Sequence, residues 1–213
     1  MVIDRSHESR IACRAMMCEE RRDIRQLLSQ LTPDQWQQDS LCRGWSVRDV
    51  VAHLVGWDDV LLYRTRREHA RALLRFTALY AGSLASMSVL NRRIQRRTRH
   101  LDATELARRF AADDNEGLKW LFDGTNPAAH LAEYVIHHQD IRRPLGLPHE
   151  VPSGRLVAAL YGVTKLPGVR WSAWRQFRTM RYEATDVEWS RGHGPVTPMS
   201  GASILMSLAG RSV

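Results

Sequence analysis

Apolar residues recur every three or four positions along most of the chain, which is the spacing of one buried helix face. The clearest stripe begins at Val47 and continues through Val50, Val51 and Leu54. The pattern predicts helices over about 8–30, 46–67, 102–122, 127–143, 152–175 and 199–209, a short turn near 32–36, and a loop or broken helix near 82–88. We therefore expect a mainly α protein, built as a helical bundle.

Polar residues, glycine and proline mark the ends of two of these helices. Ser46 is suited to cap the helix that follows it, and Asp49 stands three residues further on, as in a shortened capping box. Gly124 suits the end of one helix, Asn126 the cap of the next, and Pro127 its first position. The two helices that begin at these caps carry the candidate chemistry of the chain.

The last part of the chain follows a different pattern. Residues 177–185 alternate loosely between apolar and polar, as a strand does, and 186–190 and 192–195 have the composition of strand ends around a turn. A small β-hairpin followed by a short helix is therefore expected. On this basis residues 1–150 form a helical bundle domain, and residues 151–213 form a small α/β extension packed on it.

Composition narrows the class of protein. Hydrophobic residues make up 44% of the 213 residues, which is enough for a buried core, and no run of 18 apolar residues exists. The N-terminal segment has scattered charges in place of the apolar stretch of a secretory signal, so a cytoplasmic protein without a membrane span is expected. Three cysteines without a Cys-x-x-Cys pair argue against disulfides and against a thiolate-only zinc site.

The net charge is +8 and the pI is about 10.1, which by itself would suggest a nucleic-acid binder. Only Lys119 and Lys165 are lysines among the 31 basic residues, however. Phosphate binding does not require arginine so strongly, whereas a genome rich in G and C would produce this bias in every protein. No helix-turn-helix or zinc-finger spacing is present, so nucleic acid is not favoured as a partner.

One constellation of residues has the spacing of a metal site. Glu133 and His137 are four positions apart on a predicted helix and so share a face, whereas His138 points away from Glu133. His53 lies beside the apolar stripe of another helix, and a bundle can bring two such helices face to face. Two imidazoles and one carboxylate suit zinc and leave a position open. From spacing alone, a hydrogen-bonded core histidine and a surface Glu–His pair remain open alternatives.

Two segments carry distinctive motifs. The segment from Leu41 to Leu54 contains Gly-Trp-Ser-Val-Arg-Asp-Val-Val-Ala-His, and the segment from Glu133 to Gly146 contains Glu-x-x-x-His-x-x-Asp before a basic turn. Further short motifs lie at Arg181–Asp186, Trp189 and Leu208–Arg211. Together, and over nearly the whole chain, these motifs resemble the mycothiol-dependent maleylpyruvate isomerase-like family, which belongs to the DinB-like metalloprotein superfamily.

The resemblance implies a DinB-like four-helix bundle with a small C-terminal extension, and a divalent metal, zinc, held by His53, Glu133 and His137. It also implies that a low-molecular-weight thiol such as mycothiol binds the zinc and attacks a small electrophile, in an isomerisation or an S-transfer. The isomerase that gives the family its name has a larger C-terminal domain, whereas this sequence ends at Val213. S-transfer, or another thiol-linked reaction, is therefore expected.

The expected partners are a small-molecule thiol and an electrophilic substrate. The alternative is a non-catalytic metal-binding module of the same fold with a stress or regulatory role. The sequence leaves open which thiol and substrate are used, and whether the chain is a monomer or a homodimer.

Four further residues could each have a role in the site or a purely structural role. Asp140 could orient a ligand histidine, or it could lie exposed near the end of its helix. Asp49 is one turn before His53 and could support that ligand, but it also suits the helix cap. Trp57 could line a substrate pocket or pack in the core. Cys42 has no recognisable base near it in the sequence, so a buried structural thiol is expected.

Overall fold

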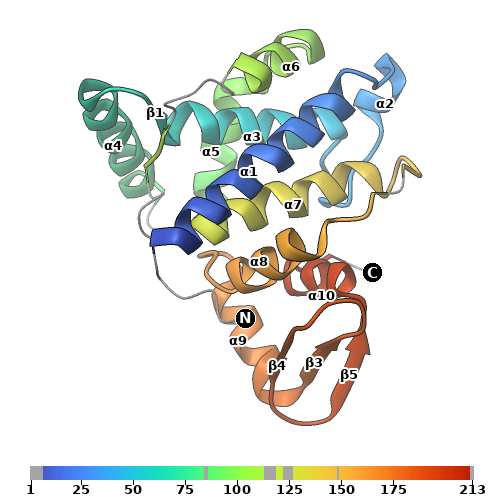
Figure 1. Cartoon of the computed structure of the whole chain (residues 1–213). Helices are drawn as coiled ribbons and strands as arrows, with labels where there is room; N and C mark the ends of the chain where they lie inside the picture. Colours follow the sequence, from blue (N-terminus) through green and yellow to red (C-terminus); the bar gives the residue numbers. More distant parts are fainter. Residues whose placement is uncertain (1–6, 84–85, 113–118, 122–126, 148, 212–213) are drawn as a thin grey trace.

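The computed structural model (Figure 1) describes residues 7–83, 86–112, 119–121, 127–147 and 149–211. Its helices are α1 (His7–Leu28), α2 (Pro33–Gln37), α3 (Val47–Leu61), α4 (Arg66–Ala81), α5 (Met87–Thr98), α6 (Ala103–Ala112), α7 (Pro127–Arg142), α8 (Ser153–Val163), α9 (Arg170–Thr179) and α10 (Gly201–Leu208). Its strands are β1 (Leu62–Tyr63), β2 (Lys119–Trp120), β3 (Arg181–Ala184), β4 (Ser190–Gly192) and β5 (Val196–Met199). The expectation of a mainly α fold with a small C-terminal β element is confirmed.

Helix α7 lies at the centre of the bundle. It contacts α1, α3 and α8, and Figure 1 shows it between α1 and α8. Every residue from Pro127 to Ile141 is buried except His130 and Glu133. A helix that is buried on nearly all sides must satisfy its polar side chains internally. The polar residues near its C-terminal end are therefore held by partners from other parts of the chain and from α7 itself.

Helix α3 begins as the sequence predicts but ends earlier. Ser46 and Asp49 form the expected reciprocal capping box. The helix stops at Leu61, so the predicted continuation to about residue 67 is wrong. The next two residues form β1, which pairs antiparallel with β2, and Thr65 then caps α4 in a new capping box. Strand pairing with a distant segment is a tertiary effect that helical periodicity does not reveal.

Two further predicted helices differ from the structure. Residues 119–120 form β2, so the helix predicted to reach residue 122 is wrong at its end, and α6 is described only to Ala112. The helix predicted over 152–175 is two helices, α8 and α9, separated by a turn. The predicted break near 82–88 agrees with the end of α4 and the start of α5, whereas the predicted cap at Asn126 and helix end at Gly124 lie outside the described residues.

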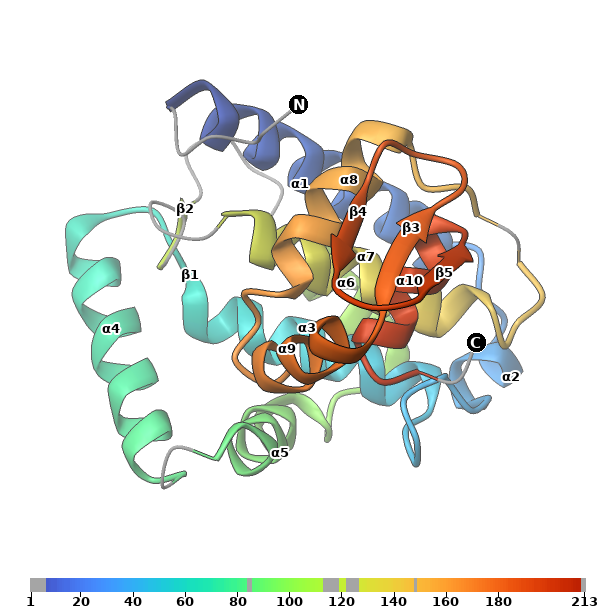
Figure 2. The same cartoon turned by 90° about the horizontal axis from the view of Figure 1, so that it is seen from below.

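The C-terminal segment forms a small mixed sheet covered by helices. Strand β3 lies between β4, with which it pairs antiparallel, and β5, with which it pairs parallel. The hairpin was predicted, whereas the parallel strand β5 was not. Figure 2 shows this sheet in the view from below, with α10 beside it, and α10 packs on α8. The division of the chain at residue 150 stays a prediction.

Helix α8 crosses α7 at very short range. A Cβ atom added at Gly162 would lie closer than 3.0 Å to the backbone of Ala128, so the two helices approach more closely there than any side chain would allow. The extension is thereby packed directly on the helix that carries Glu133 and His137. In the part of the chain that the structure describes, no helix combines the length and the apolar character needed to cross a membrane.

Candidate metal centre

Helices α3 and α7 bring the three predicted ligands together. One ligand-type atom from each of His53, Glu133 and His137 lies within 4.8 Å of the other two. The imidazole rings of His53 and His137 have their centroids 4.9 Å apart, and Nε2 of His137 is 3.3 Å from Oε2 of Glu133. A capped start fixes the register of α3, and the four-residue step on α7 places Glu133 and His137 on one face. Such a cluster has the size and the donor set of a zinc site.

The two ring nitrogens of His137 have different surroundings. Nδ1 lies 2.9 Å from Oδ2 of Asp140, and Nε2 faces Glu133. Burial raises the pKa of Asp140, but hydrogen bonds from His137 and Arg211 outweigh it and lower that pKa below its ordinary value. An ionised carboxylate only accepts hydrogen bonds, so Nδ1 carries a proton. Nε2 is therefore the nitrogen that a cation beside Glu133 would bind, in place of the proton that Nε2 shares with Glu133.

The electrostatics of Glu133 and His137 follow from their contact. Burial lowers the pKa of His137, but hydrogen bonds with Asp140, Cys42 and Glu133 outweigh it and raise that pKa well above 6.5. Burial raises the pKa of Glu133, but the hydrogen bond from His137 outweighs it and lowers that pKa. Glu133 is thus a carboxylate, and 44% of its side chain is exposed. It is the member of the group that an incoming molecule can reach.

His53 is almost completely enclosed. It is 3% exposed, and the rings of Trp45 and Trp57 lie with centroids 5.1 and 6.3 Å from its own. Burial, and next to it the charge of His137, lowers the pKa of His53 to about 3, so the imidazole is neutral. Its Nδ1 is buried and has no hydrogen-bond partner among the described residues. A neutral, enclosed imidazole with an unpartnered nitrogen fits a metal ligand better than a core histidine satisfied by hydrogen bonds.

A polar cluster lies next to Nδ1 of His137, the ring nitrogen that does not face Glu133. Arg211 donates from Nε to Oδ1 of Asp140 at 2.9 Å and from Nη2 to Oδ2 at 2.7 Å. The thiol of Cys42 donates to Oδ2 of Asp140 at 3.0 Å and accepts from Arg211 at 3.1 Å. The expectation of a simple buried thiol at Cys42 is therefore wrong, because its Sγ is half-buried and hydrogen-bonded within this cluster.

Two other groups in the described residues have metal-like spacing, and neither fits a cation as well. Cys42, His137 and Asp140 form one, but Asp140 already holds Arg211 and the proton on Nδ1 of His137. The second consists of Glu20, His138 and His149. There, two arginine side chains occupy the positions that a metal would need: Arg142 donates to Nε2 of His138, and Arg155 donates to Glu20. This second cluster is a buried ion-pair network between α1, α7 and α8.

A cavity of about 440 Å³ adjoins His53 and Glu133. Trp57 forms part of its wall, whereas a contact of this residue with substrate stays a prediction. Its inner end is formed by Asp58 and Tyr134, and Tyr134 donates to Oδ1 of Asp58 at 2.6 Å. Arg21, on α1, donates to Oδ2 of Asp58 at 2.7 Å and to Tyr134 at 2.7 Å.

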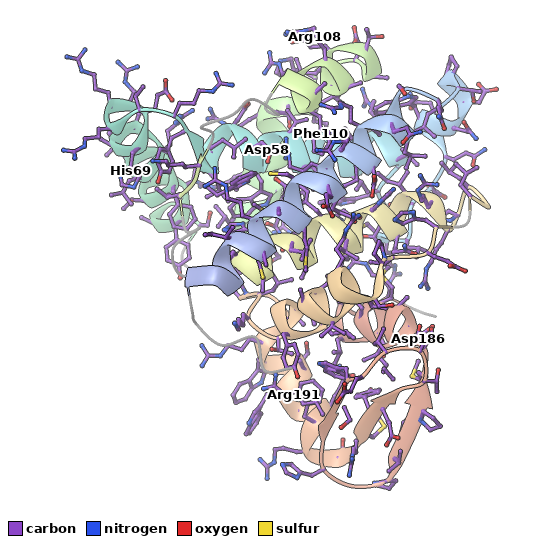
Figure 3. The ribbon with its side chains drawn as sticks, in the orientation of Figure 1. Asp58, His69, Arg108, Phe110, Asp186 and Arg191 are labelled. Carbon is purple, nitrogen blue, oxygen red and sulfur yellow. The ribbon has the colours of Figure 1, made fainter. Side chains whose placement is uncertain are left out.

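Figure 3 shows Asp58 in the interior of the bundle, close to Phe110. The backbone carbonyl of Phe110 accepts a further hydrogen bond from Arg21, at 3.2 Å. His69, by contrast, lies out on α4, and Asp186 and Arg191 lie in the C-terminal segment (Figure 3). Arg21 thus connects α1 to two residues that line the cavity, Asp58 and Tyr134.

Several residues of this site were not identified from the sequence. Arg21 and Asp58 gave no signal, because nothing in their spacing relates them to Tyr134, and Trp45 was noticed only as part of the motif that ends at His53. Arg211 was noticed only as part of a tail motif, without a role. The carboxylate of Asp49 accepts hydrogen bonds from Ser46 in the helix cap, and the backbone N–H of Asp49 donates to the hydroxyl of Ser46.

Comparison with known proteins gives one result of consequence. Searches among curated proteins and among solved structures gave no match. The model of one protein family, described as the mycothiol maleylpyruvate isomerase N-terminal domain, matches residues 18–142. That segment covers more than half of the chain and contains the candidate ligands and Asp140, whereas Arg211 lies outside it. The chain therefore belongs to the mycothiol maleylpyruvate isomerase N-terminal domain family.

Proposed function

We propose that this protein is a zinc-dependent enzyme that uses a low-molecular-weight thiol, mycothiol or a related compound, to attack a small electrophile. S-transfer is the favoured reaction, and a cis–trans isomerisation of the kind named by the family is the second. The observation that carries the proposal is the meeting of His53, Glu133 and His137 within 4.8 Å, beside a cavity large enough for a substrate.

Each residue of the site has a role in this proposal. His53, Glu133 and His137 would hold the metal: His53 as a neutral imidazole, Glu133 as a carboxylate, and His137 as an imidazole that gives up its Nε2 proton when the metal binds. Asp140 fixes the proton of His137 on Nδ1 and so directs Nε2 toward the metal position. The rings of Trp45 and Trp57 shield His53 from water.

The chemistry of the thiol follows from three protein ligands. When bound, zinc with an open position would lower the pKa of an incoming thiol and favour its thiolate form. In an S-transfer the thiol loses its proton to solvent, its sulfur forms a bond to the electrophilic carbon, and the leaving group departs with its bonding electrons. Glu133 is the exposed ligand, so the thiol and the substrate would meet on the cavity side of the site.

Metal analysis of the purified protein tests the first half of the proposal. Near-stoichiometric zinc is expected in the wild type and in His100→Ala, a control at an exposed histidine. His53→Ala and His137→Ala should each lose the metal while keeping the helical circular-dichroism spectrum. Retention of zinc by both site variants would rule out the assigned ligand set.

A conjugation assay tests the second half. The protein is mixed with mycothiol and a panel of electrophiles, with chelator, without chelator, and with zinc added back after chelation. Conjugates that disappear with chelator and return with zinc are expected. Stoichiometric zinc without conjugation of any electrophile would instead favour the alternative of a non-catalytic metal-binding module.

A further inference from the structure

We infer that the cavity beside Glu133 and His53 binds an uncharged aromatic group, and that the electrophile of this protein is therefore a neutral aromatic compound rather than a carboxylate. This inference rests on the proposed function and specifies its substrate class. It comes from three features of the cavity: the aromatic character of its wall, the pairing of its polar groups, and the absence of lysine and arginine among its described lining residues.

The wall of the cavity is mainly apolar and aromatic. Trp57 of α3, Phe76 and Tyr80 of α4, Met87 of α5 and Trp120 of β2 line it from different directions. Phe76 and Tyr80 are stacked with centroids 5.8 Å apart and an interplanar angle of 16°. Flat rings and a methionine form favourable contacts with an aromatic ligand. A volume of about 440 Å³ exceeds the roughly 150 Å³ that holds benzene, so a substituted ring fits.

The polar groups at the inner end of the cavity are already satisfied by one another. Both carboxylate oxygens of Asp58 accept short hydrogen bonds, one from Tyr134 and one from Arg21. The hydroxyl of Tyr134 also accepts from Arg21 and, at 3.4 Å, from Trp120. The positive charge of Arg21 is neutralised by Asp58 and lies under the wall at 1% exposure. These groups offer a ligand no unpaired charge, so they favour a neutral occupant.

The carboxylates Asp58 and Glu133 and the histidines His53 and His130 are the ionisable acids and bases that line the cavity, apart from the tyrosines. Among the described lining residues there is no lysine or arginine, whereas Glu133 is an exposed carboxylate. A dicarboxylate of the kind named by the family would bury its charges beside aromatic rings without a cationic partner. A bound zinc would offer one open coordination position to an anion, but the thiol needs that position. A neutral electrophile meets no such cost.

Helix α4 provides the outer wall and the means of testing the inference. It stands at the edge of the molecule in Figures 1 and 2, and its residue Phe76 lines the cavity. Tyr80 lies at the rim, 41% exposed. Leu74, on the same helix, is 72% exposed and does not line the cavity, so it supplies a matched control.

The experiment compares two ligands that differ in one substituent, a neutral methyl group in para-nitrotoluene and a carboxylate in para-nitrobenzoate. Neither has a group that thiols displace, so binding to the zinc-loaded full chain, with mycothiol in excess to occupy the zinc position, is measured without turnover, by calorimetry and by tryptophan quenching. The neutral compound should bind on the order of tenfold more tightly. Phe76→Ala should weaken its binding several-fold, and Leu74→Ala should not change it. Equal or tighter binding of the carboxylate, or no effect of Phe76→Ala, would overturn the inference.

A charge introduced at the rim gives an independent measurement. Tyr80→Arg should tighten the binding of para-nitrobenzoate and so reduce or reverse the preference for para-nitrotoluene. Leu74→Arg should leave this preference unchanged. An unchanged preference in Tyr80→Arg would place the ligand elsewhere and overturn the inference. The outcomes separate the two proposals, because selective binding can persist without thiol conjugation, and conjugation of carboxylated electrophiles can persist without selective binding.

Discussion

Arg211 holds the carboxylate of Asp140 with two parallel hydrogen bonds, of 2.9 and 2.7 Å. Asp140 lies behind the candidate ligand His137, at 2.9 Å from its Nδ1. A side chain that follows the last helix thus fixes the orientation of a side chain on the central helix. The segment that matches the family model ends at residue 142, so the site depends on a residue beyond that segment.

Replacement of Arg211 should loosen His137 and weaken metal binding. Removal of a residue behind a metal ligand commonly costs 10- to 100-fold in affinity. Arg211→Met is expected to fall in that range, and Arg211→Lys should recover part of the loss because it keeps the charge but not the two-pronged contact. Competition with a chromophoric zinc chelator measures the affinity. Arg175→Met, at an exposed arginine of α9, is the control. Equal affinities in Arg211→Met and wild type would contradict the positioning role.

The hydroxyl of Tyr134 should contribute measurably to stability. It donates to Asp58 and accepts from Arg21, all in the interior. Tyr134→Phe leaves these partners short of one bond each, and we expect a loss of about 1–3 kcal/mol in the free energy of unfolding. Urea unfolding followed by circular dichroism measures it. Tyr80→Phe, at the exposed rim, should lie within about 0.5 kcal/mol of wild type. A loss of the same size in both variants would argue against the network.

The close crossing of α7 and α8 predicts a sharp difference between two glycines. Gly162→Ala would push a methyl group into the backbone of Ala128, and a destabilisation of more than about 3 kcal/mol is expected because neither helix can move away without opening the core. Gly168→Ala meets nothing within 4 Å and should be neutral or slightly stabilising. Thermal unfolding of both variants checks the pair. A well-tolerated Gly162→Ala would show that α8 is not held against α7 as described.

Protonation of Glu20 should account for part of the loss of folding stability in acid. Burial raises the pKa of Glu20, but hydrogen bonds from His138 and Arg155 outweigh it and lower that pKa below 4.5. A carboxyl group whose pKa is lower in the folded chain stabilises the fold above its unfolded pKa, and this contribution is lost as the pH falls through the folded value. Glu20→Gln should therefore be about 3 kcal/mol less stable than wild type at neutral pH, and the difference should shrink below about pH 4.5.

The control for this prediction uses the same arginine. Glu19 also bonds Arg155, but its side chain is 52% exposed, whereas that of Glu20 is fully buried. Glu19→Gln should cost less than about 1 kcal/mol at any pH, since exposed ion pairs contribute little. Denaturant unfolding at a series of pH values would show the two behaviours. A pH-independent gap between wild type and Glu20→Gln would mean that Glu20 is not ionised in the folded chain.

The sequence by itself determined the helical character of this protein and the local placement of its candidate ligands. Helical periodicity, the Ser46 cap and the four-residue step from Glu133 to His137 are local features, set by residues within a turn or two of one another. The motifs around His53 and Glu133 also led to the family. The helices predicted near residues 62 and 119 were wrong, because two distant segments pair there as strands.

Only the tertiary structure decided what surrounds the ligands. Arg211 reaches Asp140 from the end of the chain, Cys42 joins them from a loop, and the cavity takes its wall from α3, α4, α5, β2 and α7. Contacts of this kind depend on how helices pack, and packing depends on shape and burial across the whole core rather than on spacing along the chain. The residue types can be read in order from the sequence, but their meeting around one point exists only in three dimensions.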